Sequence, residues 1–317
     1  MPRKSTRREI LSHSITAAGA AAMLTQTSSL VAAEGSSTRE PFGYCLNTST
    51  IRGQKLPLAK EIEIAARAGY KGIEPWVAEI DQHVKSGGTL ADLRKQIADL
   101  GLSVESVIGF AEWVVDDEAR RAKGLAEAKR IMDLTAEIGG KRLAAPAAGV
   151  SEKDHLDLPT IAKRYRALLA LGERQGVAPQ LELWGFARVL SKLSEVAYVA
   201  IEADHPQACI LADSYHLYKG GTDLSNLRLL SGDAMHVFHI NDYPASPERK
   251  DITDAFRVFP GDGVAPLAAL FKTLNQIGFR GMLSLEVFNR EYWNQDALFI
   301  ARSGLEKTRE AVQKALA

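Results

Sequence analysis

CILADSYH, at residues 209–216, is one of four short apolar runs in the second half of the chain that each end in a side chain able to bind a metal. The other three are QLELWG (180–185), HVFHIND (236–242) and MLSLEVFN (282–289). Each run is rich in Val, Ile, Leu or Phe and is bounded by Gly, Pro, Asn or Asp, which is typical of buried parallel strands. The runs therefore predict four successive strands of one parallel sheet.

A metal-competent side chain closes each run: Glu182, Asp213, His239 and Glu286. A buried carboxylate is costly unless a positive group meets it. Two glutamates, one aspartate and one histidine from successive strands can share one divalent cation, so we predict an enzyme with these four residues as its metal ligands. Taken singly, each residue also has a structural explanation, as a salt-bridged carboxylate, a capping aspartate or a packed core histidine.

The ligand types narrow the choice of metal. Carboxylate oxygens suit Mg²⁺ and Mn²⁺, and one imidazole moves the preference toward Mn²⁺, Co²⁺ or Zn²⁺. The set therefore favours one Mn²⁺ ion, with Mg²⁺, Co²⁺ and Zn²⁺ as alternatives. The lack of cysteine ligands and of an HxxxH pair argues against a structural zinc site.

The body of the chain repeats a strand followed by a helix, as parallel sheets do. Eight such units in about 275 residues predict an α/β fold, a (β/α)8 TIM barrel, whose functional side chains lie at the C-terminal ends of strands. The alternative, an open doubly wound sheet, normally has a glycine-rich turn after its first strand, which Asn47-Thr48-Ser49-Thr50 does not resemble. The predicted strands are 42–47, 70–76, 103–110, 142–146, 180–184, 208–213, 235–241 and 281–288. The predicted helices are 58–68, 90–100, 116–138, 158–176, 190–203, 224–230, 267–277 and 298–315.

The first 33 residues resemble an export leader. Arg7 and Arg8 form a twin-arginine pair, a mildly apolar stretch follows, and small residues end it at 31–33. We therefore expect a signal peptide at 1–33, a linker at 34–40 and one catalytic barrel at 41–317, exported to a bacterial periplasm. An uncleaved membrane anchor is the alternative, although Gly, Ser, Thr and Gln make this stretch a poor spanning helix.

Charge and cysteine content exclude several classes of protein. Lys plus Arg and Asp plus Glu both number 39, so the net charge is zero and nothing indicates a nucleic acid or, after leader removal, a membrane as partner. Cys45 and Cys209 each lie within an apolar run, which indicates two buried free thiols. A neutral small molecule is the expected partner.

The combination of LELWG, LADSYH, HVFHIND, PGDG (260–263) and LSLEVFN resembles the sugar phosphate isomerase and epimerase family, whose barrel is xylose-isomerase-like. Its members include D-tagatose 3-epimerase, inosose isomerase, inosose dehydratase and hydroxypyruvate isomerase. The resemblance covers residues 41–317 and is stronger in the last four units. It implies that Glu182, Asp213, His239 and Glu286 bind one divalent metal, Mn²⁺ in many relatives.

The resemblance also implies roles for three further residues, and this chain departs from the family pattern at one position. His216 matches a histidine that contacts a substrate oxygen, Arg257 matches a substrate-binding arginine, and Glu74 matches a glutamate outside the ligand shell. Where the epimerases have a further glutamate that meets substrate hydroxyls, this chain has Arg188. Substrate preference is therefore not carried over. Relatives are often dimers or tetramers, so a homo-oligomer stays an open expectation.

These residues suggest a mechanism. We expect proton transfer on the carbon beside a ketone, in a keto-sugar or keto-inositol, through a metal-stabilised cis-enediolate with Glu182 and Glu286 as the two proton carriers. An inosose-dehydratase-like lyase is the alternative, because the same enediolate can expel water. A non-catalytic exported sugar-binding protein and an endonuclease IV-like hydrolase are further alternatives. Four tryptophans at predicted strand ends or loops could stack on a sugar ring or pack the rim: Trp76, Trp113, Trp184 and Trp293.

Overall fold

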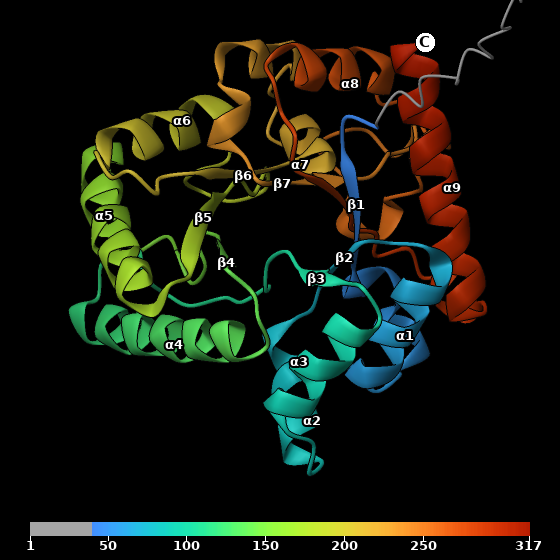
Figure 1. Cartoon of the computed structure of the whole chain (residues 1–317). Coiled ribbons are helices and arrows are strands. Elements are labelled where there is room, and N and C mark those ends of the chain that lie inside the picture. The colour runs from blue at the N-terminus through green and yellow to red at the C-terminus, as the bar shows by residue number, and fades with distance from the viewer. Residues whose placement is uncertain (1–39) are drawn as a thin grey trace, which may run out of the picture. The chain divides into compact units, whose positions relative to one another are not determined.

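Eight parallel strands close into a barrel in the computed structural model, which describes residues 40–317 (Figure 1). The strands are β1 Gly43–Asn47, β2 Gly72–Glu74, β3 Ser103–Val104, β4 Arg142–Ala145, β5 Ala178–Glu182, β6 Ile210–Asp213, β7 Val237–Ile240 and β8 Met282–Leu285. They pair in the order β3-β2-β1-β8-β7-β6-β5-β4. A single bridge between Val107 and Leu143 joins the two ends of this order and closes the barrel. The predicted TIM barrel is confirmed.

Helices surround the strands, as Figure 1 shows. They are α1 Leu58–Ala68, α2 Val77–Lys85, α3 Leu90–Asp99, α4 Glu118–Glu137, α5 Leu158–Gln175, α6 Leu193–Glu202, α7 Ser214–Lys219, α8 Leu267–Gln276 and α9 Ala297–Leu316. Short 3-10 helices lie in the loops: η1 Thr48–Gln54, η2 Leu224–Leu229, η3 Gly232–Ala234, η4 Asp254–Phe256 and η5 Tyr292–Asn294. Each long helix before α9 runs back across the outside of the barrel and returns the chain toward the start of the next strand.

The structure corrects several predicted boundaries. The strand expected at 103–110 pairs regularly only over Ser103–Val104, and isolated bridges at Val107 and Ile108 continue it. The segment expected as a helix at 224–230 is the 3-10 helix η2. Helices α2 and α7 were not predicted, because each directly follows a strand and has no separating loop signal.

Side chains alternate between the outer and inner faces of the strands. Outward residues such as Leu181, Phe238 and Leu285 join the main hydrophobic core under the helices. A separate small cluster holds Ile108, Ala144, Leu211 and Val237. The residue two positions further along a strand points to the same face, so Asp213 follows Leu211 and His239 follows Val237. Below the strand ends, the interior therefore holds these apolar side chains together with the buried polar Gln180 and Ser284, and at its C-terminal end it is charged.

The predicted leader at 1–33 and all but the last residue of the linker at 34–40 lie outside the described residues, and they stay predictions. Within residues 40–317, every helix is too short or too polar to cross a bilayer.

A buried carboxyl group lies in α1, apart from the inward-facing strand ends. Glu61 is 2% exposed, and its Oε2 has no hydrogen-bond partner among residues 40–317. Burial and, to a smaller extent, the charge of Glu79 raise the pKa of Glu61 to about 9, while Arg52 opposes this. Because the folded-state pKa lies above the usual value of 4.5, the native state retains a proton that the unfolded chain loses as the pH rises.

We expect Glu61→Gln to stabilise the protein at pH 8 by roughly 1–3 kcal/mol and to have a much smaller effect at pH 5, because the amide removes the cost of burying a carboxylate. Thermal unfolding at both pH values measures the change. The matched control is Glu63→Gln, which loses only an exposed pair with Lys60 and should shift stability little at either pH. An unchanged or lower melting temperature for Glu61→Gln at pH 8 contradicts this account.

Candidate metal centre and substrate pocket

Three of the predicted ligands converge at the C-terminal end of the barrel. Asp213 ends β6, His239 lies in β7 beside it in register, and Glu286 directly follows β8. One ligand atom from each residue lies within 4.8 Å of the others, and all three residues are buried. This Asp213/His239/Glu286 group could therefore bind a metal ion.

The orientation of His239 is set by Glu74. His239 Nε2 lies 2.9 Å from Glu74 Oε2. Although burial acts to raise it, the positive charge of His239 and three hydrogen-bond donors lower the pKa of Glu74. An ionised carboxylate only accepts, so Nε2 carries the hydrogen and Nδ1 is left to face the other carboxylates. A histidine oriented in this way by a carboxylate is the usual arrangement of a metal ligand.

Nδ1 of His239 faces the two acidic members of the group. It lies 3.3 Å from Glu286 Oε2 and 3.8 Å from Asp213 Oδ2. It makes no hydrogen bond among residues 40–317. Although burial acts to lower it, the charges of Glu286 and Glu74 raise the pKa of His239 well above its ordinary value. The site therefore favours a positive charge at this point, which a divalent cation would supply.

Glu182 stands apart from the three. It ends β5 and is 4% exposed, but its carboxylate is not among the ligand atoms that lie within 4.8 Å of one another. Its Oε2 has no hydrogen-bond partner in the described part of the chain. Burial raises the pKa of Glu182 to about 8. Its ligand role stays a prediction, and the observed geometry gives it a free oxygen beside the group.

The predicted substrate-binding pair, Arg257 and His216, lies against the carboxylates. Nη1 of Arg257 donates to Asp213 Oδ2 and Glu286 Oε2, at 2.8 Å each. Its Nη2 lies 3.1 Å from His216 Nε2 and also donates to Asp254. Burial lowers the pKa of His216 to about 4, so the imidazole is neutral. Arginine only donates, so His216 Nε2 accepts and Nδ1 carries the hydrogen.

Asn47 was not predicted as a site residue, although it connects several of its parts. Its Nδ2 donates to Glu286 Oε1 at 3.1 Å and to Glu74 Oε2 at 3.0 Å. Its Oδ1 accepts from Trp76 Nε1 at 2.9 Å. Asn47 closes β1 in register with Glu74, and a polar residue at the end of the first strand was the signal that could have identified it.

The loop after β7 carries Arg257 and is anchored at two places. Lys219 in α7 donates to the carbonyls of Arg249, Lys250 and Ile252, at 2.8–3.0 Å. Further along the loop, the carboxylate of Asp242 accepts from the backbone of Gly261, Gly263 and Ala265. The PGDG sequence therefore folds around Asp242, and the buried guanidinium is held against the acidic group.

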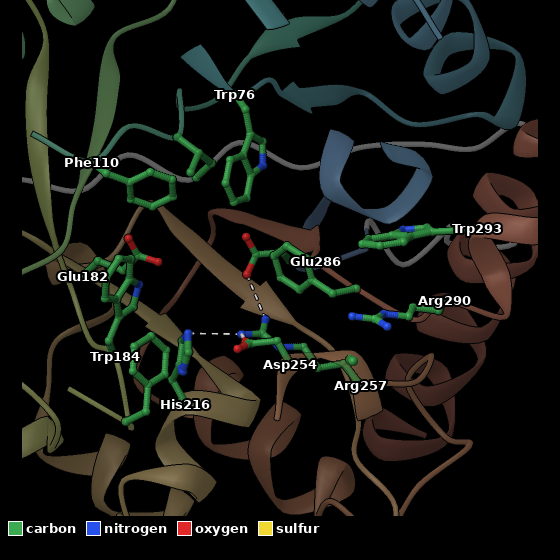
Figure 2. Close-up of a pocket in the computed structure, with 14 residues that line it drawn as sticks. Trp76, Phe110, Glu182, Trp184, His216, Asp254, Arg257, Glu286, Arg290 and Trp293 are labelled. Atoms are coloured by element: carbon green, nitrogen blue, oxygen red, sulfur yellow. Dashed lines mark hydrogen bonds and ion pairs between the residues drawn. The ribbon is translucent and has the colours of Figure 1, made fainter. Parts of the chain in front are cut away.

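A pocket of about 380 Å³ lies at this acidic group, and Glu182, His216, Arg257 and Glu286 line it. The aromatic part of its wall is Trp76, Phe110, Trp184, Phe186, Phe288 and Trp293. In Figure 2, Glu182 and Trp184 appear at the left, with Arg290 and Trp293 at the right. Trp113 is absent from this wall, because it is buried in the core and donates to the carbonyl of Pro146. Three of the four tryptophans near the predicted mouth thus line the pocket.

The chain is similar in sequence to known proteins with the same type of barrel. The family described as "Xylose isomerase-like TIM barrel" matches residues 62–312. The chain is 27% identical over 233 residues to 3-dehydroshikimate dehydratase of Pseudomonas putida, across 73% of this chain and 36% of that protein. It therefore spans about a third of that dehydratase. It is 26% identical over 275 residues to inosose isomerase of Bacillus velezensis, across 85% of this chain and 97% of that protein.

Solved structures share the fold. An IolI protein with a bound zinc atom aligns with a TM-score of 0.80 and 22% identity, over 87% of this chain and all of that one. An L-ribulose 3-epimerase aligns with a TM-score of 0.68 and 19% identity, over 86% of this chain and 95% of that one.

We expect Glu74→Gln to weaken Mn²⁺ or Zn²⁺ binding about 10- to 100-fold, because the carboxylate that orients His239 is lost. Isothermal titration of the metal-stripped protein measures this affinity without turnover. The matched control is Glu112→Gln, which loses only an exposed pair with Arg120 and should bind metal as the wild type does. Unchanged affinity in a folded Glu74→Gln variant would show that His239 is not a ligand oriented by Glu74.

Proposed function

We propose that this chain, which belongs to the xylose isomerase-like TIM barrel family, is a divalent-metal-dependent isomerase or epimerase of a keto-sugar or keto-inositol. The observation that carries the proposal is a buried oxygen of Glu182 that has no hydrogen-bond partner among residues 40–317. It lies in the same pocket as Glu286, beside the Asp213/His239/Glu286 group. Similarity to inosose isomerases supports the reaction class.

The donor set fits a divalent metal. His239 Nδ1 and Glu182 Oε2 are buried polar atoms without hydrogen-bond partners among residues 40–317. Asp213, His239 and Glu286 would hold the ion, with Glu182 as a fourth ligand. We propose Mn²⁺, and the bound zinc of the IolI protein makes Zn²⁺ the first alternative. When bound, such an ion supplies a Lewis acid that stabilises negative charge developing on substrate oxygens.

The two glutamates differ in their freedom to exchange protons. Oε1 of Glu286 accepts from Asn47, and its Oε2 accepts from Arg257, so both of its oxygens already have a hydrogen-bond donor. Glu182 has one oxygen without a partner in the described part of the chain, and burial raises its pKa to about 8. A carboxyl group with a pKa near neutrality can take up and release protons at physiological pH. We therefore assign removal of the substrate proton to Glu182, and the return of a proton, taken up beforehand from solvent, to Glu286.

His216 and Arg257 bind and orient the substrate in this proposal. Nδ1–H of His216 is a buried donor with no partner among residues 40–317. It is available to the oxygen on which charge develops, where such donors lower the barrier most. The guanidinium of Arg257 bridges Asp213 and Glu286, and its Nε is a buried donor with no partner among residues 40–317, which leaves it available to the substrate.

Dehydration is the second candidate function, and similarity to 3-dehydroshikimate dehydratase supports it. The same proton removal would be followed by loss of a β-hydroxyl as water. A panel of ketoses, inososes and cyclic hydroxyketones, followed by NMR in D₂O with the Mn²⁺-loaded protein, separates the candidates. Deuterium in a product that retains all its oxygens supports isomerisation, and loss of water supports the lyase. Tight binding with no deuterium exchange at any carbon would overturn both in favour of a binding protein.

We expect Glu182→Gln to slow deuterium exchange by at least about 10²-fold while the protein retains its metal, because the three mutually close ligand residues remain. Glu286→Gln should lose both exchange and metal, since it removes one of those three. Exchange is measured by NMR and metal content by mass spectrometry on the same samples. Glu152→Gln changes an exposed side chain and serves as control. Wild-type exchange rates in Glu182→Gln would refute the two-glutamate scheme.

A further inference from the structure

We propose that Arg290 binds a carboxylate substituent on a ring-shaped substrate, so that the pocket prefers a cyclic keto-sugar or keto-inositol derivative that carries a carboxylate to its neutral counterpart. This inference rests on the proposed function, since it names the substrate class of the same site. The evidence for it is the aromatic wall of the pocket and the guanidinium of Arg290 that lines it.

The aromatic wall is continuous from one side of the pocket to the other. The ring of Trp76 lies 6.0 Å from that of Phe288 and 5.2 Å from that of Phe110. Phe110 lies 5.6 Å from Trp184, which in turn stacks on Phe186 at 5.3 Å. A continuous row of aromatic side chains suits a ring whose C–H bonds can pack against it. The wall therefore favours a cyclic substrate over an open chain.

The two guanidinium groups that line the pocket differ in what they already bind. Arg257 is already paired with three carboxylates, those of Asp213, Glu286 and Asp254. Arg290 lines the pocket and makes no hydrogen bond or ion pair with residues 40–317. Figure 2 shows its guanidinium pointing toward the pocket. An arginine that faces a ligand cavity with all its donors unused is suited to an anionic partner.

The loop that carries Arg290 is held on both sides. Before it, Asn289 donates to the carbonyl of Arg257 at 3.1 Å. After it, Trp293 donates to the carbonyl of Ser49 at 3.0 Å, and Tyr292 stacks on Phe259 with ring centroids 4.2 Å apart. Because the backbone on either side is fixed, binding at the exposed Arg290 side chain need not order the loop that carries it.

The pocket selects a carboxylate over a phosphate. Glu182, Asp254 and Glu286 line the same cavity and would repel a dianion more strongly than a monoanion. No lysine is among the lining residues of the described chain, and Arg290 is the one lining guanidinium that has no acidic partner there. One planar guanidinium matches one carboxylate with two parallel hydrogen bonds. We therefore expect Arg290 to pair with a single carboxylate of the substrate.

Benzoate and benzamide test this inference, because they have nearly the same shape and differ in charge. We expect the Mn²⁺-loaded wild type to bind benzoate at least tenfold more tightly than benzamide, as measured by titration calorimetry or by quenching of the pocket tryptophans. Arg290→Gln should remove this preference and leave benzamide affinity unchanged. The control Arg188→Gln, an exposed arginine outside the pocket lining, should keep the preference.

Three outcomes would overturn the proposal: no preference for benzoate in the wild type, a preference that survives Arg290→Gln, or no binding of either probe. A preference that depends on the metal and survives Arg290→Gln would place the carboxylate on the ion. The titrations need no turnover, so a protein that binds benzoate through Arg290 yet exchanges no deuterium would refute the proposed function alone. A protein that exchanges deuterium on inososes and binds both probes equally would refute this inference alone.

Discussion

Four carboxylates are buried together at the C-terminal end of the barrel, and the rest of the site is arranged around their charge. Glu74, Glu182, Asp213 and Glu286 are each at most 4% exposed. Two cationic side chains meet them: Arg257 bridges Asp213 and Glu286, and His239 lies among Glu74, Asp213 and Glu286. Burying unpaired charge costs several kcal/mol per ion, so a cluster with this excess of carboxylates is stabilised by further positive charge. The same excess makes the site a receptor for a dication.

The strand ends could be predicted because their signal is local. Asp213 and His239 each close a short apolar run, and parallel strands bring such ends to one edge. The contribution of Asn47 could not be predicted in this way, because its partners Glu74 and Glu286 lie 27 and 239 positions away. Strand register and barrel closure create those contacts, and neither leaves a periodic pattern in the chain.

The difference in role between Glu182 and Glu286 could not be predicted from the sequence either. Its position after an apolar run is equivalent to that of Glu286, so the pattern treats the two residues alike. The structure separates them by what surrounds each carboxylate: Glu286 accepts from Asn47 and Arg257, while Glu182 Oε2 accepts from no residue in the described range. Chemistry of this kind depends on side chains from other strands, which is why residue type and spacing predict a site more readily than the roles within it.

The bridge between Val107 and Leu143 is the weakest strand pairing of the barrel. β3 pairs regularly only with β2, and β4 pairs regularly only with β5. Segments held by few backbone hydrogen bonds open first in local fluctuations. Amide hydrogens along this pairing should therefore exchange with solvent sooner than those of β7 and β8, where the acidic group is anchored. Phe110 follows this pairing directly and belongs to the aromatic wall. Local opening at the Val107–Leu143 bridge would loosen the aromatic wall that contacts the ring of a ligand. The acidic group at the ends of β6, β7 and β8 would stay in place.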